Sequence, residues 1–191
     1  MYKACKTKQS AERQRYIVNG LVEMLQSQRF SEVTVQSLCR QAQLPRKTFY
    51  RYFEGKEDVL DAMIDLATMD YESFCGPYRA GESRTSEKEM ERLFQFWLQH
   101  KNILDALQRS GMSGRLIERS MHLSYLEKVG YRLANHSGEA GPDTFRMTTY
   151  FSICGLYVLI LDWHHRGCLE TPGEMAHATY KLLTEPLYRT L

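Results

Sequence analysis

The strongest chemical signal in this 191-residue chain is the run PRKTFYRYF at residues 45–53. Phe49 and Phe53 are four residues apart, so both would face inward from a short helix. The outer face would then carry basic and hydroxyl side chains, namely Arg46, Lys47, Thr48, Tyr50 and Arg51. Guanidinium and ammonium groups bind phosphates and guanine edges, and hydroxyl groups bind phosphate oxygens. The run therefore predicts a helix that contacts a nucleic acid.

A helix-turn-helix would hold this face in position. Residues 34–42 combine a threonine cap with apolar residues at helical spacing, which predicts a short first helix. Pro45 disfavours helical backbone at Leu44 but suits the first turn of a new helix, so we expect a second helix over about 45–53. Two short helices around a tight turn place the second one in the major groove of DNA.

A longer helix is expected to follow Gly55 and to continue toward Phe74. Its first turn carries acidic residues, and an inward apolar stripe follows. Lys56 stands at its start, where the free N–H groups of a helix end favour anions. We therefore expect Lys56 to contact a phosphate.

Positive charge is concentrated in the N-terminal third. Residues 1–60 carry a net charge of +5 and the remainder a net charge of −3. This asymmetry predicts that the N-terminal part meets a polyanion. An arm with Lys3, Lys6 and Lys8 precedes the first helix, and it either follows the DNA or remains without contact.

The whole chain reads as all-α, because clear apolar periods are helical. We divide it into a helix-turn-helix domain at 1–60 and a C-terminal ligand-binding and dimerisation domain at 61–191. A long helix is expected over 115–135. Residues 144–163 are apolar on all sides, which calls for a second covering surface such as a partner subunit. Thr171, Pro172 and Glu174 then form a capping box that begins the last helix.

The segment LCRQAQLPRKTFYRYFEGKEDVL at residues 38–60 closely resembles the DNA-binding domain of the TetR family of regulators. The resemblance implies a homodimer through the last two helices, bound to a pseudo-palindromic operator on double-stranded DNA. It further implies repression, with release by a small molecule in the C-terminal domain. Thr48, Tyr50 and Lys56 match the family's usual phosphate contacts. Arg46, Lys47 and Arg51 match positions that vary with operator sequence.

Two positions depart from the family pattern. Gln43 stands where the family usually has glycine in the turn, and Pro45 stands where a small polar residue often begins the recognition helix. We expect Gln43 to adopt the unusual backbone of the turn and Pro45 to occupy the first helical position.

Several C-terminal residues have side chains that suit a bulky apolar ligand, because thioethers and aromatic rings adapt to such molecules. Membership of an ordinary core is the alternative interpretation. The candidates for an effector pocket are Phe94, Trp97, Met121, Tyr125, Phe151 and Tyr157.

Other classes of protein find little support. No catalytic motif or cofactor loop is present, so we expect neither an enzyme nor a cofactor. His164, His165 and Cys168 are close in sequence, but adjacent histidines point to different helix faces and no metal is expected. Five scattered cysteines, Cys39 among them as a core residue, favour a reducing compartment.

We expect a cytoplasmic protein without a membrane span, because no secretion signal or long apolar run is found. The main rival function is a co-activator or adaptor of the same fold that acts through a protein partner. An affinity for duplex DNA that falls steeply with salt would separate the two.

Overall fold

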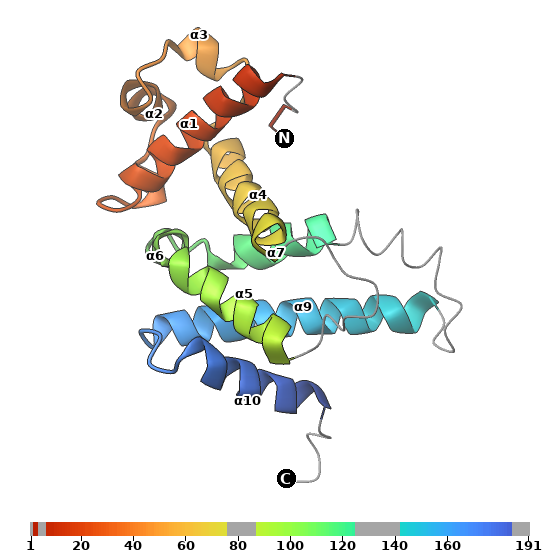
Figure 1. Cartoon of the computed structure of the whole chain (residues 1–191). Helices are drawn as coiled ribbons and strands as arrows, with labels where there is room; N and C mark the ends of the chain where they lie inside the picture. Colours follow the sequence, from red (N-terminus) through yellow and green to blue (C-terminus); the bar gives the residue numbers. More distant parts are fainter. Residues whose placement is uncertain (1, 4–6, 76–86, 125–141, 185–191) are drawn as a thin grey trace.

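A computed structural model of the chain describes residues 2–3, 7–75, 87–124 and 142–184. Every element among these residues is a helix, so the predicted all-α fold is confirmed. Figure 1 shows a small N-terminal group of helices above a larger group, with α4 running between them. The elements in chain order are α1 (Lys8–Met24), the 3-10 helix η1 (Phe30–Glu32), α2 (Val35–Gln41), α3 (Arg46–Phe49), α4 (Lys56–Cys75), α5 (Glu87–Gln99), α6 (Lys101–Arg109), α7 (Ser113–Ser124), α9 (Pro142–His165) and α10 (Pro172–Thr184).

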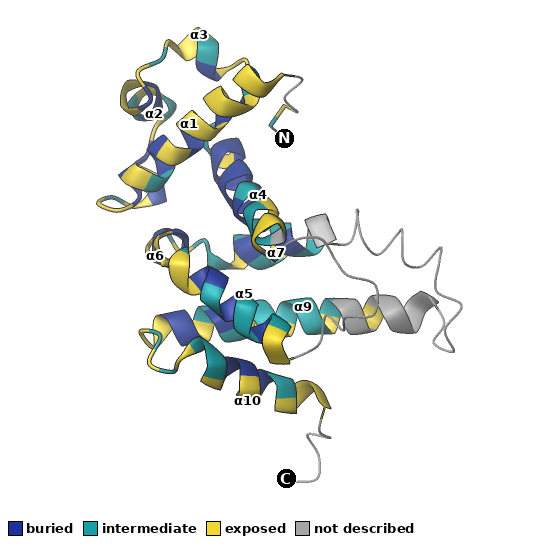
Figure 2. Ribbon diagram, viewed as in Figure 1, coloured by how far each residue is buried: buried dark blue, intermediate teal, exposed yellow. Residues whose placement is uncertain are grey.

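The N-terminal group, here called the head, consists of α1, η1, α2 and α3. Helix α1 turns an apolar stripe inward, with Ile17 and Leu21 fully buried, while its other face is exposed (Figure 2). The Thr34 hydroxyl accepts from the Ser37 amide at 3.0 Å and so caps α2, as the sequence predicted. The head therefore forms from local signals that agree with each other.

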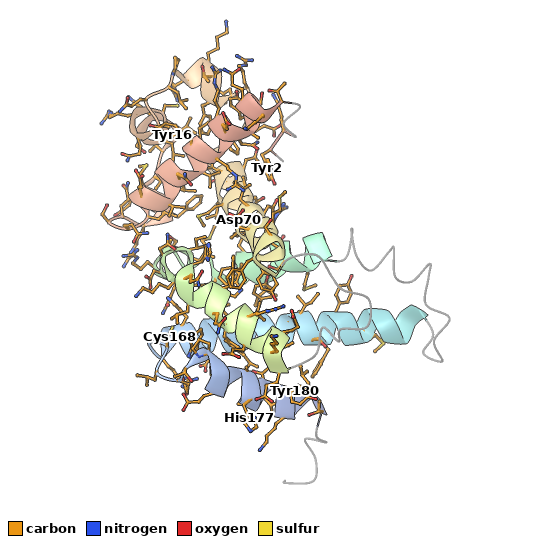
Figure 3. All side chains as sticks on the ribbon, in the orientation of Figure 1. Tyr2, Tyr16, Asp70, Cys168, His177 and Tyr180 are labelled. Atoms are coloured by element: carbon orange, nitrogen blue, oxygen red, sulfur yellow. The ribbon has the colours of Figure 1, made fainter. Side chains whose placement is uncertain are left out.

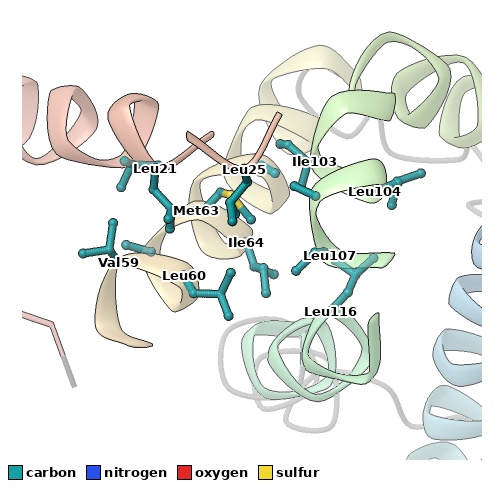
Figure 4. Packing of buried hydrophobic residues seen from close by; sticks show 14 of the residues in the cluster. Leu21, Leu25, Val59, Leu60, Met63, Ile64, Ile103, Leu104, Leu107 and Leu116 are labelled. Carbon is teal, nitrogen blue, oxygen red and sulfur yellow. The ribbon is translucent and has the colours of Figure 1, made fainter. Parts of the chain in front are cut away.

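The head and the remaining helices share one core. Figure 4 shows leucines of α1 meeting residues of α4, and these in turn meeting α6 and α7. Burying each such side chain stabilises the fold by roughly 1.5–3 kcal/mol. A division at residue 60 falls inside α4, which belongs to both parts. The labelled residues of this shared core are Leu21, Leu25, Val59, Leu60, Met63, Ile64, Ile103, Leu104, Leu107 and Leu116.

Helices α5, α6, α7, α9 and α10 form the larger group, here called the body. Helix α5 packs along α10, and α7 packs against α9. The rings of Phe94 and Trp163 meet edge to face with centroids 5.3 Å apart. The Glu174 amide donates to the Thr171 hydroxyl, and the Glu174 carboxylate accepts from the Thr171 amide at 2.8 Å, which confirms the predicted capping box.

The long helix expected over 115–135 begins at Ser113 and is described to Ser124, and its remaining part lies outside the described residues. Along the described part of the chain, no helix combines the length and the apolar character needed to cross a membrane.

Candidate nucleic-acid interface

The turn between α2 and α3 is a Schellman motif built on Gln43. The Leu44 amide donates to the Cys39 carbonyl at 3.0 Å, and the Gln43 amide donates to the Arg40 carbonyl at 3.1 Å. Gln43 has a φ of +47°, in the left-handed region that glycine occupies without strain. The backbone expected of Gln43 is confirmed, and the turn forms although a glutamine stands at its critical position.

Helix α3 is shorter than predicted. It spans Arg46–Phe49, with Pro45 as its N-cap at ψ 147°, so the expectation that Pro45 is the first helical residue was wrong. Pro45 is extended, and the helix begins one residue later as a result. Single turns continue the chain, as in the bond from the Phe53 amide to the Phe49 carbonyl at 3.1 Å. We call residues 46–53 the recognition segment.

The recognition segment separates apolar from basic side chains, as the spacing predicted. Phe49 and Phe53 are fully buried, with ring centroids 5.6 Å apart. Thr48 is half-buried, while Arg46, Lys47, Tyr50 and Arg51 are exposed. Cations and hydroxyls are thus presented on a face supported by two buried rings, an arrangement able to contact phosphates and base edges.

Lys56 has a different environment from the other predicted contacts. Its ammonium donates to the carbonyls of Phe30, Ser31 and Val33 at 2.9, 3.3 and 2.8 Å, and it lies 4.7 Å from the centre of the Phe30 ring. An ammonium has three N–H donors, and these contacts use all of them. Lys56 therefore ties η1 to the start of α4, and a phosphate would have to displace one of these carbonyls.

A groove of about 550 Å³ runs beside the recognition segment. Gln9, Arg13 and Tyr16 of α1 form one wall, and Pro45 and Thr48 form part of the other. Tyr16, labelled in the head in Figure 3, is 53% exposed. Side chains of α1 that line the groove would therefore lie close to a polyanion that α3 contacts.

Comparison with known proteins finds a family match in the N-terminal region of this chain. Residues 17–63, which include α2, α3 and the start of α4, match the model of the family described as bacterial regulatory proteins, tetR family. The N-terminal region of the chain is thus similar to the DNA-binding region of the tetR family. It is 37% identical to the HTH-type transcriptional regulator EthR of Mycolicibacterium smegmatis over 54 residues, which are 28% of this chain and 25% of that protein.

Solved structures of TetR-family regulators share the fold over most of its length. A putative TetR-family transcriptional regulator from Syntrophomonas wolfei superimposes with a TM-score of 0.66 at 16% identity, covering 93% of this chain and 97% of that one. NalD, the secondary repressor of the MexAB-OprM multidrug efflux pump in Pseudomonas aeruginosa, superimposes with a TM-score of 0.52 at 15% identity, covering 91% of this chain and 96% of that one. The TetR architecture of a head on a helical body is thereby shown.

The structure brings only some of the candidate effector residues together. Phe94 and Trp97 of α5 are buried, and the Trp97 ring lies 6.0 Å from that of Tyr157 on α9, centroid to centroid. The Met121 sulfur is 3.2 Å from Cys154 Sγ. Phe151 is 72% exposed on the outer side of α9 and does not join this group. Tyr125 lies outside the described residues.

The buried group around Trp97 contains an unusual polar atom. The indole nitrogen of Trp97 is buried and has no hydrogen-bond partner among the described residues. Burial raises the pKa of the Tyr157 hydroxyl, and the polar side chains of Ser120 and Thr68 partly offset this. A buried N–H without a partner is costly, so an acceptor on a bound molecule would be favourable here.

The residues considered for metal or redox chemistry have ordinary partners. His164 Nε2 lies 2.9 Å from an Asp105 carboxylate oxygen, and His165 Nδ1 contacts the Gln108 amide. Within the described ranges no three His, Cys, Asp or Glu side chains are grouped so as to hold a metal ion. Burial raises the pKa of the Cys39 thiol, which keeps it protonated and unreactive.

Sequence reasoning missed a charged layer between α4 and α7. Arg115 donates to Asp61 at 2.7 and 2.8 Å, and Arg119 Nε donates to Asp65 at 3.0 Å. Hydrogen bonds to these carboxylates raise the pKa of both arginines. Two carboxylates on the inward stripe of α4 and two arginines four residues apart on α7 were the available signal, since buried charges require partners.

Proposed function

We propose that the chain is a homodimeric transcriptional repressor that binds a pseudo-palindromic operator through its recognition segment and leaves it when a small molecule binds in the body. The observation that carries the proposal is the exposed basic face of Arg46, Lys47 and Arg51 on a helix-turn-helix of TetR type. Repression is carried over from relatives such as NalD, which is described as a repressor.

DNA contact is supported by the separation of buried apolar from exposed basic side chains within the recognition segment. Arg46, Lys47 and Arg51 are the candidates for base edges and phosphates, and Thr48 and Tyr50 are candidates for phosphate oxygens. Lys56 joins them only if it exchanges a backbone carbonyl for a phosphate.

A dimer is supported by an apolar face on α9 and α10. Phe151 and Val158 of α9 and Leu182 and Leu183 of α10 are 72%, 53%, 45% and 38% exposed. They lie along a groove of about 280 Å³ between the two helices. Exposed apolar patches of this kind mark interfaces, and a second copy of the same face would cover it symmetrically.

The experiment that tests DNA reading is selection of duplexes from a random library by the wild type, Lys47→Ala and Arg51→Ala. We expect an inverted repeat, because a symmetric dimer reads two half-sites about one DNA turn apart. Each variant should bind it more weakly. Loss of a phosphate contact should lower the magnitude of the slope of log K against log salt concentration, here called the salt dependence, by about 0.9 per contact. Lys88→Ala, in the first turn of α5, is the matched control and should bind as the wild type does.

The second candidate function is a co-activator or adaptor that acts through a protein partner, and the exposed apolar face is the observation that favours it. If the wild type selects no motif at moderate salt, the adaptor gains support. Analytical sedimentation tests whether a second copy of the chain covers the apolar face of α9 and α10. Phe151→Glu should give monomers if a second copy does so, while Leu169→Glu, in the loop before α10 and 80% exposed, should leave the dimer intact.

Release by an effector is tested through the intrinsic fluorescence of Trp97. The chain has two tryptophans, so Trp163→Phe leaves Trp97 as the sole tryptophan, whose emission can be excited separately from that of the tyrosines. We expect apolar small molecules that carry a hydrogen-bond acceptor to change this emission and to weaken operator binding. In the otherwise wild-type protein, Trp97→Phe should reduce the effect of these molecules on operator binding. If the small molecule acts by shifting the dimer to another conformation, the distance between probes attached at Lys47 of the two subunits should change when it binds. An unchanged distance would contradict this mechanism.

A further inference from the structure

The N-terminal dipeptide Tyr2-Lys3 lies against the end of the recognition segment. The Lys3 amide donates to the Tyr52 carbonyl at 3.0 Å, and its ammonium donates to the Tyr50 carbonyl at 3.4 Å. These carbonyls follow the end of α3, where intrahelical partners are lacking. The Lys3 carbonyl in turn accepts from Gln14 Nε2 of α1 at 3.0 Å. Lys3 is thus held between α1 and the recognition segment.

Tyr2 extends this connection to α4. Its ring lies 6.2 Å from that of Phe53, centroid to centroid, and its hydroxyl donates to Asp65 at 2.7 Å. Figure 3 places Tyr2 at the junction of the head with α4. Asp65 is 2% exposed and also binds Arg119 of α7. One carboxylate therefore receives both the N-terminal tyrosine and an arginine of the body.

The Tyr2 hydroxyl remains a donor under all ordinary conditions. Burial, together with the hydrogen bond to Asp65 and its negative charge, raises the pKa of Tyr2 well above its usual value. The hydrogen bond to the Asp65 carboxylate is charge-assisted and stronger than a neutral one.

We propose that Tyr2 and Lys3 are positioning residues for DNA reading, which hold the carbonyl end of the recognition segment on α4 without touching DNA themselves. The inference rests on the proposed DNA-binding function. Helix α3 has four residues, which is too short for a helix to be stable by itself, so its orientation depends on what it is tied to. Base contacts tolerate only small errors of position. The Lys3 ammonium uses one donor for the Tyr50 carbonyl, and the salt dependence of a Lys3 variant tests whether this side chain also binds phosphate.

Tyr2→Phe tests the proposal because it removes one hydroxyl and keeps the ring that packs on Phe53. With the operator selected by the wild type, we expect the affinity to fall about fivefold, the equivalent of one hydrogen bond, with an unchanged salt dependence. Lys3→Met should also weaken binding without changing the salt dependence. Arg15→Gln, which breaks the exposed ion pair between α1 and Asp70, is the control, and its affinity should be within about twofold of that of the wild type.

Two outcomes of the binding experiment would overturn the proposal. The first is wild-type affinity for Tyr2→Phe. The second is a salt dependence that falls by about 0.9 in Lys3→Met, since that would assign Lys3 a phosphate contact.

Hydrogen exchange of the free protein separates failure of this proposal from failure of the DNA-binding function. We expect amides of residues 49–53 to exchange faster in Tyr2→Phe than in the wild type, while those of α9 and α10 are unchanged. Faster exchange supports the positioning role of Tyr2 and Lys3, and unchanged exchange overturns it, whether or not the wild type selects an operator.

Discussion

The guanidinium of Arg109, at the end of α6, donates to the carbonyl of Leu25, at the end of α1, with an Nη2–O distance of 2.7 Å. A second nitrogen of the same group donates to the Gln26 carbonyl at 2.8 Å. The neighbouring Ser110 hydroxyl accepts from the Phe30 amide at 3.1 Å. The end of α6 therefore caps the end of α1 and the start of η1, and a movement of α6 would displace or break these contacts.

Arg109→Gln should destabilise the protein by loosening this cap. A hydrogen bond to a charged group contributes about 1.5–3 kcal/mol, and because Arg109 is exposed we expect a loss at or below the lower end of that range. Urea denaturation measures it. Arg166→Gln breaks two exposed ion pairs at the end of α9 and should have a smaller effect, because exposed ion pairs contribute little. Equal losses in the two variants would contradict the capping role.

Arg119→Met should be far more destabilising than Arg15→Met. The first leaves the buried Asp65 without its arginine, a change that costs about 3–5 kcal/mol in comparable cases. The second breaks the exposed pair with Asp70, whose side chains are 51% and 42% exposed, and should cost about 1 kcal/mol or less. Chemical denaturation of both variants gives the comparison, and a loss below about 1 kcal/mol for Arg119→Met would show that the α4–α7 layer is not a buried charge pair in energetic terms.

Gln43→Gly should stabilise the protein. A left-handed backbone costs a residue with a Cβ about 1–2 kcal/mol, and glycine adopts it without that cost. We expect the free energy of unfolding to rise by about 1 kcal/mol, with operator binding retained. Gln36→Gly is the matched control, because it places glycine at an exposed position inside α2 and should lower stability by about 1 kcal/mol. A loss of stability in Gln43→Gly would mean that the φ of +47° is not under strain.

The capping box of α10 should make stability depend on pH in the acid range. Hydrogen bonds from the Thr171 amide and then its hydroxyl hold the pKa of Glu174 below its usual 4.5. A carboxylate whose pKa is lower in the folded state stabilises above its unfolded-state pKa, and the contribution is lost as the pH falls through the folded-state pKa.

We therefore expect the stability advantage of the wild type over Glu174→Gln to be constant between about pH 7 and 5 and to shrink below about pH 4. Thermal unfolding across this range measures it. Thr171→Val keeps the amide partner of Glu174 and should show the same trend at reduced amplitude. An advantage that grows on acidification would refute the assignment.

Local signals in the sequence were sufficient for the helices and for the inward and outward faces of the recognition segment. Phe49 and Phe53 are buried because residues four apart share a helix face, and Thr34 and Thr171 cap helices because their hydroxyls reach amides three residues on. The TFYRYF motif at residues 48–53 pointed to the tetR family for the same reason, since it lies within one supersecondary unit.

Partners distant in sequence were decided only by the tertiary structure. Lys56 meets carbonyls 23 to 26 residues away, and Phe151 lies on the outer face of α9 although its type suited a pocket. Tyr2 reaches Asp65 across 63 residues, and Arg109 reaches Leu25 across 84. Periodicity gives the face of a helix but not the neighbour that it meets, because that neighbour depends on how all the helices pack together. The sequence by itself thus determined the helices and the chemistry they present, and their packing determined which of those groups bind each other and which remain free for a ligand.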